Sequence, residues 1–192
     1  DRSWYDHRGI NWLVRAARLE IRTSIPVGST VVGTTEVVGF RRVWSRRRST
    51  FGLDGSPVAA VVDIDWLLLD ARGAPTRIPP EFDAAFGAPP ASFALARVDL
   101  GDSPPEATTA TFTVRPQELD PMDHANNAVY ADWLEERVIE AGGLDGIAAT
   151  RALPRLARLE YARSAERAAT IQATTWPDAG DAGWSCRVDA AD

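Results

Sequence analysis

Most of the chain alternates between apolar and polar residues, the pattern of half-buried β-strands. Residues 29–40 and 41–52 are rich in β-branched and aromatic side chains, and residues 57–70 form a third run of this kind. Asp54-Gly55, between the second and third runs, predicts a tight hairpin turn. These patterns predict long antiparallel strands.

A helical pattern occurs once, after a short alternating segment at residues 109–116 that predicts another strand. Asn126 or Asn127 suits the N-cap of this helix, and Gly142-Gly143 suits its C-terminus. We therefore expect an α+β fold in which an antiparallel sheet wraps around a long helix. The apolar stripe of the helix consists of Tyr130, Trp133, Leu134, Val138 and Ala141.

The sequence contains an internal repeat. Residues 17–37 and 157–177 both open with Ala-Arg-Leu-Glu and then share a serine and three threonines in one ungapped register, at an offset of 140 residues. The same offset pairs Trp44-Ser45 with Trp184-Ser185. A register held this long predicts two copies of one structural unit.

The repeat and the composition together suggest domain boundaries. We predict a first unit at residues 1–82, a linker rich in Pro, Ala and Gly at residues 83–108, and a second unit at residues 109–192. The offset of 140 residues places the counterpart of the helix before residue 1, and that of the strand at residues 57–70 beyond residue 192. We therefore expect the first unit to lack an N-terminal strand and helix, and the second its last strand.

Composition narrows the possible functions. A net charge of −6 argues against nucleic-acid binding, and no apolar run reaches the length of a membrane-spanning helix. Cys186 is the single cysteine, which excludes an internal disulfide and every Cys-based metal site. A single cysteine fits a reducing compartment, so we expect a cytoplasmic protein. We expect no cofactor.

Five arginines within residues 41–48 stand out in this acidic chain. Such a cluster can bind phosphates or an acidic partner. It can also be a solvated edge strand protected by its charge. The sequence leaves both interpretations open.

The loop ahead of the helix carries the candidate chemistry. A carboxylate at Asp120 can orient a water, deprotonate it or attack directly, and His124 can donate to a carbonyl or shuttle a proton. Backbone N–H groups at the start of a helix can hold an oxyanion. Three other interpretations stay open: a purely structural helix cap, a metal site on Asp120, Asp123 and His124, and a nucleophilic Cys186.

The segment LDPMDHANNAVYADWLEE, residues 119–136, resembles the motif of hotdog-fold thioesterases. Residues 12–37, 62–82 and 156–168 are similar to stretches of acyl-ACP thioesterases, the plant enzymes and their bacterial relatives. The resemblance implies two hotdog units in tandem. It also implies hydrolysis of a fatty acyl thioester on acyl carrier protein (ACP) or CoA, a reaction of fatty acid biosynthesis.

The same resemblance assigns residues to the site. It implies catalytic roles for Asp120 and His124. A family asparagine position falls on Met122 and a family glutamate position on Ser164, so Glu166, two residues on, is the candidate replacement for the glutamate. We also expect the N–H groups that follow Asn126, including that of Asn127, to form the oxyanion site.

Two other functions remain open from the sequence: a hotdog hydratase or dehydratase, and an acyl-thioester-binding protein without catalysis. The expected partner is an acyl-ACP or acyl-CoA substrate, with Arg46 and Arg48 in contact with the acidic carrier or the CoA phosphates. A homodimer is also possible.

Overall fold

The computed structural model describes residue 5 and residues 7–87, 94–179 and 183–191. The chain divides into two compact units. Unit 1 comprises residues 1–97 and 153–161, and unit 2 comprises residues 98–152 and 162–192. Antiparallel sheets and one long helix make the fold α+β, consistent with a hotdog fold and confirming the predicted class.

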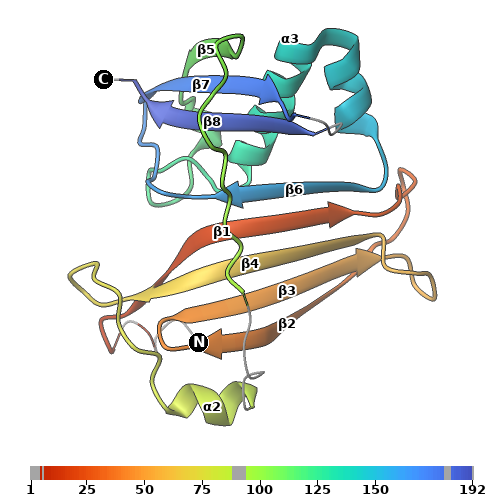
Figure 1. Cartoon of the computed structure of the whole chain (residues 1–192). Coiled ribbons are helices and arrows are strands. Elements are labelled where there is room, and N and C mark those ends of the chain that lie inside the picture. The colour runs from red at the N-terminus through yellow and green to blue at the C-terminus, as the bar shows by residue number, and fades with distance from the viewer. Residues whose placement is uncertain (1–4, 6, 88–93, 180–182, 192) are drawn as a thin grey trace. The chain divides into compact units, whose positions relative to one another are not determined.

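Unit 1 is built on a five-stranded antiparallel sheet in the order β2-β3-β4-β1-β6 (Figure 1). A short helix, α2, packs on this sheet through Phe82, whose ring centroid lies 4.9 Å from that of Phe40 and 5.8 Å from that of Trp12. The elements are β1 (Asn11–Ile21), β2 (Val32–Arg41), β3 (Trp44–Gly52), β4 (Ala60–Leu69), α2 (Glu81–Phe86) and β6 (Arg155–Glu160).

The arginine-rich strand β3 lies between β2 and β4, so the edge-strand interpretation of the arginine cluster is wrong. Its hairpin to β4 is confirmed. Gly55 has a φ of 68°, the left-handed conformation that glycine adopts without steric cost, and the N–H of Ser56 donates to the carbonyl of Leu53 at 3.1 Å. Charged side chains on an interior strand need partners within the sheet.

Unit 2 has a three-stranded sheet in the order β5-β7-β8, against which the long helix α3 packs (Figure 1). Trp133 of α3 is 1% exposed and forms a core with Val114 and Ile171. The predicted strand and helix are therefore confirmed. The elements are β5 (Thr108–Thr113), the 3-10 turn η1 (Pro116–Glu118), α3 (Val129–Arg151), β7 (Thr170–Pro177) and β8 (Trp184–Ala190).

The helix is interrupted at Gly142-Gly143, where its end was predicted. Gly143 has non-helical angles, φ 55° and ψ −122°, and the helical hydrogen bonding resumes after this kink and continues to Arg151. The glycine pair thus breaks the helix into two segments. Gly146 lies in the second segment, close to the carbonyl of Val138 in the first.

The predicted linker at residues 83–108 lies partly outside the described residues. Its beginning overlaps α2. Farther on, the carbonyl of Ala94 accepts a hydrogen bond from Arg46, and the N–H of Ala96 donates to Asp65. This part of the segment is therefore fixed to the sheet of unit 1, while the predicted domain boundaries stay a prediction.

The two copies of the repeat contribute neighbouring strands to one sheet. Shifted by 140 residues, β1, β2 and β3 overlap β6, β7 and β8. In the antiparallel pair of β1 and β6, Arg18 lies opposite Arg158, its own counterpart in the repeat. Ala17 faces Leu159 and Leu19 faces Ala157, so the register is symmetric about the two arginines.

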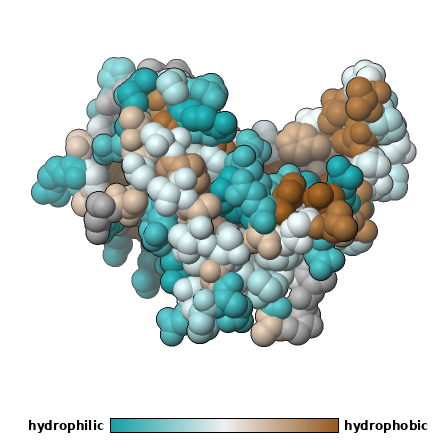
Figure 2. All heavy atoms as spheres, turned by 90° about the horizontal axis from the view of Figure 1, so that it is seen from above, coloured by the Kyte–Doolittle hydropathy of each residue, from teal (hydrophilic) through white to brown (hydrophobic). Residues whose placement is uncertain are grey.

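Within the described part of the chain, no helix is long and apolar enough to cross a membrane. On the face shown in Figure 2, hydrophobic side chains gather in local patches among hydrophilic ones. Exposed large apolar residues of unit 2 include Met122, Ile139 and Leu144.

Candidate functional site

The loop between η1 and α3 closes on itself like a small hairpin. The N–H of Asn126 donates to the carbonyl of Glu118 at 2.8 Å, and the N–H of Asp120 donates to the carbonyl of His124 at 2.7 Å. The N–H of Asp123 donates back to the carbonyl of Asp120 at 3.0 Å. These bonds bring Asp120 and His124 together in one tight turn directly ahead of the helix.

The carboxylate of Asp120 is oriented by this turn. Its Oδ1 atom accepts hydrogen bonds from the N–H groups of Met122, at 2.8 Å, and His124, at 3.2 Å. The side chain of Met122 itself points into solvent and is 72% exposed. Position 122 therefore orients the aspartate through its backbone, which a methionine supplies as well as an asparagine.

His124 lies opposite Glu166 in an antiparallel bridge. The next pair is held by the N–H of Ala125, which donates to the carbonyl of Ala165 at 2.8 Å, and both alanines are buried. Side chains alternate between the faces of such a pairing, so His124 and Glu166 lie on the face away from the core. Among the described residues, the His124 ring has no hydrogen-bond partner. Ser164 is exposed.

The start of α3 differs from the expected oxyanion site. The side chain of Asn126 accepts a hydrogen bond from the N–H of Ala128 at 3.0 Å, and its carbonyl accepts one from the N–H of Val129 at 2.9 Å. Two of the N–H groups that follow Asn126 are therefore already occupied. Asn127 is exposed, and the N-cap position itself is Ala128.

Glu118 is a buried acid at the base of the loop that the sequence analysis missed. It is 5% exposed and accepts hydrogen bonds from the Arg115 side chain and, at 3.1 Å, from the indole of Trp133. Burial by itself would raise the pKa of Glu118, but these bonds and the one from the Arg115 N–H hold it below the usual value. The charged glutamate ties the loop to the helix. The spacing Arg-x-x-Glu in the sequence was a signal for it.

Tyr130 joins the core, as its place in the apolar stripe predicts. Its hydroxyl oxygen accepts a hydrogen bond from the N–H of Ala165 at 3.1 Å, and burial raises its pKa. The ring centroid lies 4.8 Å from that of Trp133. The helix thus positions the segment that carries Ser164 and Glu166.

Asp123 is engaged by an arginine of that segment. The Nε atom of Arg167 donates to both carboxylate oxygens of Asp123, at 3.0 and 2.9 Å, and the Nη2 atom donates to Oδ1. The hydrogen bond to Arg167 lowers the pKa of Asp123. Within the described residues there is no cluster of three side chains suited to a metal, so the metal interpretation gains no support.

Two of the five arginines of the cluster are paired within unit 1. Arg46 forms a two-pronged ion pair with Asp65, at 2.6 and 2.8 Å, and Arg48 forms one with Asp63, at 2.7 and 2.8 Å. Asp65 is 2% exposed. Both guanidinium groups neutralise buried carboxylates, which leaves the expected contact with a carrier or CoA without support.

Cys186 lies on β8 and is half-buried. The hydroxyl of Thr175 donates to its sulfur at 3.2 Å, and burial raises the pKa of the thiol. A raised thiol pKa disfavours the thiolate that a nucleophile requires. This environment argues for a structural cysteine.

Residues 101–190 match the model of the acyl-ACP thioesterase C-terminal domain family. The fold is similar to that of an oleoyl thioesterase from Lactobacillus plantarum, with a TM-score of 0.82 and 17% identity over 99% of this chain and 75% of that one. A 12:0-ACP thioesterase from Umbellularia californica gives a TM-score of 0.72 and 20% identity over 92% and 69% of the two chains.

An acyl-ACP thioesterase from Bacteroides thetaiotaomicron gives a TM-score of 0.77 and 12% identity over 98% of this chain and 74% of that one. Curated protein sequences provide no match to this chain.

Proposed function

We propose that the chain is a thioesterase that hydrolyses an acyl thioester through Asp120 and His124, since residues 101–190 match the model of the acyl-ACP thioesterase C-terminal domain family. The observation that carries the proposal is the tight turn of residues 118–126. It joins an oriented carboxylate and an imidazole that has no hydrogen-bond partner among the described residues, within the segment that the family model covers.

The chemistry follows from the two side chains. Asp120 has one oxygen held by two N–H groups, so its other oxygen can accept a proton from a water that attacks the thioester carbonyl. His124 can donate a hydrogen bond to the carbonyl oxygen as negative charge develops there. The proton that Asp120 took from the water then passes to the thiolate as the C–S bond breaks, which regenerates the carboxylate. The products are a fatty acid and a free thiol. Because the N–H groups of Ala128 and Val129 are occupied, we assign carbonyl stabilisation to His124 rather than to them.

Glu166 is the candidate third member of the site. It faces His124 across the bridge, two residues beyond the position of the family glutamate at Ser164. A carboxylate there lies on the same face of the pairing as the imidazole and can orient it when substrate is bound. Glu166→Gln is expected to lower kcat by about tenfold, less than the loss of an acid or base that touches substrate. Ser164→Ala is expected to have no effect.

The test is a turnover assay for free thiol over a series of acyl-ACP and acyl-CoA substrates. The proposal predicts turnover, and a loss of roughly a hundredfold or more in kcat for Asp120→Asn and for His124→Gln. Asp132→Asn, an exposed aspartate of α3, is the matched control and should keep full activity. Wild-type rates in both site variants would refute the assignment. Tight acyl-CoA binding without turnover would instead identify a non-catalytic binding protein.

The tandem arrangement of two hotdog units is part of the proposal. Its support is the internal repeat, the overlap of three strands with three strands at the same offset, and the symmetric pairing of β1 with β6. The two proposed hotdog units are residues 1–82 and residues 109–192. Strand β6, which belongs to the second of these by sequence, pairs with β1 in the five-stranded sheet. A homodimer is tested by light scattering across protein concentrations.

A further inference from the structure

We propose that Arg167 is a positioning residue that clamps the catalytic loop through Asp123. This inference rests on the proposed function, because it assigns a role in the geometry of Asp120 and His124. Arg167 directly follows Glu166 in the chain and Asp123 directly precedes His124. The ion pair therefore flanks the pairing of His124 with Glu166.

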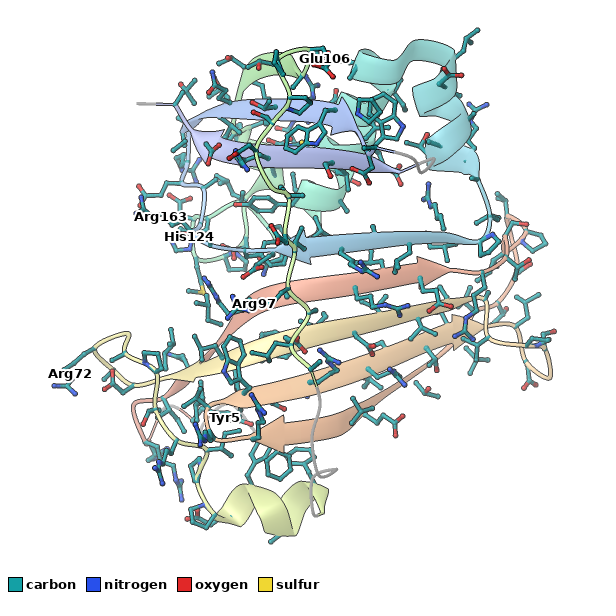
Figure 3. The ribbon with its side chains drawn as sticks, viewed as in Figure 1. Tyr5, Arg72, Arg97, Glu106, His124 and Arg163 are labelled. Atoms are coloured by element: carbon teal, nitrogen blue, oxygen red, sulfur yellow. The ribbon has the colours of Figure 1, made fainter. Side chains whose placement is uncertain are left out.

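Three successive contacts hold the loop to this segment. The ion pair of Asp123 with Arg167 comes first, the backbone bridge of His124 with Glu166 second, and the hydrogen bond from Ala125 to Ala165 third. The third contact is buried, whereas the first lies in solvent. Figure 3 shows His124 in the loop that leads to α3. Among the described contacts, the ion pair is the one that joins the side chain of Asp123 to the segment of Arg167.

The backbone conformation of Asp123 connects the ion pair with Asp120. Its φ is 68°, in the left-handed region that few residues other than glycine, asparagine and aspartate adopt. This conformation directs the chain after Asp123 so that the N–H of His124 reaches the carboxylate of Asp120. If Asp123 changed to negative φ, this contact would be lost and Asp120 would keep only the hydrogen bond from the N–H of Met122.

Because the ion pair of Arg167 with Asp123 is exposed, its effect on turnover can be measured apart from its effect on stability. The side chains of Arg167 and Asp123 are 56% and 57% exposed, and exposed ion pairs contribute little to global stability. A change in turnover without a change in unfolding temperature therefore reports the loop geometry. Small misplacements of a catalytic group are enough for large losses, about a hundredfold for about 1 Å.

The experiment compares kcat, KM and Tm for Arg167→Ala, Arg167→Lys, Asp123→Asn and the double variant Asp123→Asn/Arg167→Ala. Asparagine tolerates positive φ, so Asp123→Asn removes the charge and leaves the backbone conformation accessible. We expect kcat to fall by about tenfold or more in Arg167→Ala, with KM and Tm close to wild type. The lysine variant should recover part of the loss, and the double variant should be no worse than either single one.

Arg163→Ala is the matched control. Arg163 is an exposed arginine of the same segment, labelled near His124 in Figure 3, and among the described residues no hydrogen bond or ion pair joins it to the loop. Its substitution should leave kcat unchanged. Wild-type kcat in Arg167→Ala and Asp123→Asn, while Asp120→Asn is inactive, would overturn the clamp and leave the proposed function standing.

Amide hydrogen exchange tests the clamp even if the wild-type protein shows no turnover, an outcome that would refute the proposed function alone. The N–H groups of Met122 and His124 donate to Asp120 and should be protected in the wild type. Arg167→Ala should speed their exchange, whereas Arg163→Ala should not. Equal protection of both amides in Arg167→Ala would overturn the clamp.

Discussion

Replacing Arg46 by alanine is expected to destabilise the protein strongly. The guanidinium group is 16% exposed and its partner Asp65 is 2% exposed, so the variant leaves a buried carboxylate without its counter-charge. Removing one partner of a buried pair costs about 3–5 kcal/mol. The hydrogen bond to the carbonyl of Ala94, at 2.7 Å, is lost as well. With a denaturant slope of about 2 kcal/mol per molar, the urea midpoint should fall by about 2 M.

Two further variants make this prediction specific. Arg47 lies on the same strand but is exposed, and Arg47→Ala should change the free energy of unfolding by less than about 0.5 kcal/mol. The double variant Arg46→Met/Asp65→Leu should regain much of the lost stability, because two apolar side chains replace the pair without an isolated charge. An unchanged urea midpoint in Arg46→Ala, together with a salt-dependent rise in KM for acyl-ACP, would refute the reasoning and restore the carrier contact.

Three other predictions concern unit 2. Because the pKa of Glu118 is lower folded than unfolded, its stabilisation is complete above the unfolded pKa of about 4.3 and is lost as pH falls through the folded pKa. Glu118→Gln should therefore flatten the acid limb of the stability curve measured by urea unfolding at several pH values. Gly146→Ala should lower Tm, because its Cβ would lie within 2.2 Å of the carbonyl of Val138. Cys186→Ser should keep thioesterase activity, and the wild-type thiol should react slowly with a disulfide reagent until the protein unfolds.

The sequence predicted the elements whose pattern is local. Alternation located the strands and the apolar stripe located the helix, because burial on one face imposes a period on the sequence. It did not predict that β6 would join the sheet of unit 1, since strand partners depend on contacts far apart in the chain. The glycine pair marked the end of the first helical segment, but the sequence did not predict the second segment, which follows Gly143 and continues to Arg151.

The sequence predicted which residues form the candidate site, but it did not predict the hydrogen bonds that orient them. Asp120 and His124 follow from the motif, yet the two N–H groups that orient Asp120 are backbone atoms and leave no mark in the sequence. Met122 therefore seemed a defect at a polar family position, whereas any residue other than proline can supply its N–H. Arg46 and Arg48 show the opposite case, because a basic cluster suggested a surface for anions and the structure uses it to balance buried acids.

The symmetric pairing of β1 with β6 has a consequence for how the protein responds to dilution. When the same strand register joins two separate chains, the apparent stability depends on protein concentration. Here both strands belong to one chain, so this pairing by itself adds no dependence of the unfolding midpoint on protein concentration. A strand pair made of identical chains also carries each substitution twice. In this chain a substitution at Arg18 leaves Arg158 unchanged, so β1 and β6 can be altered independently of each other.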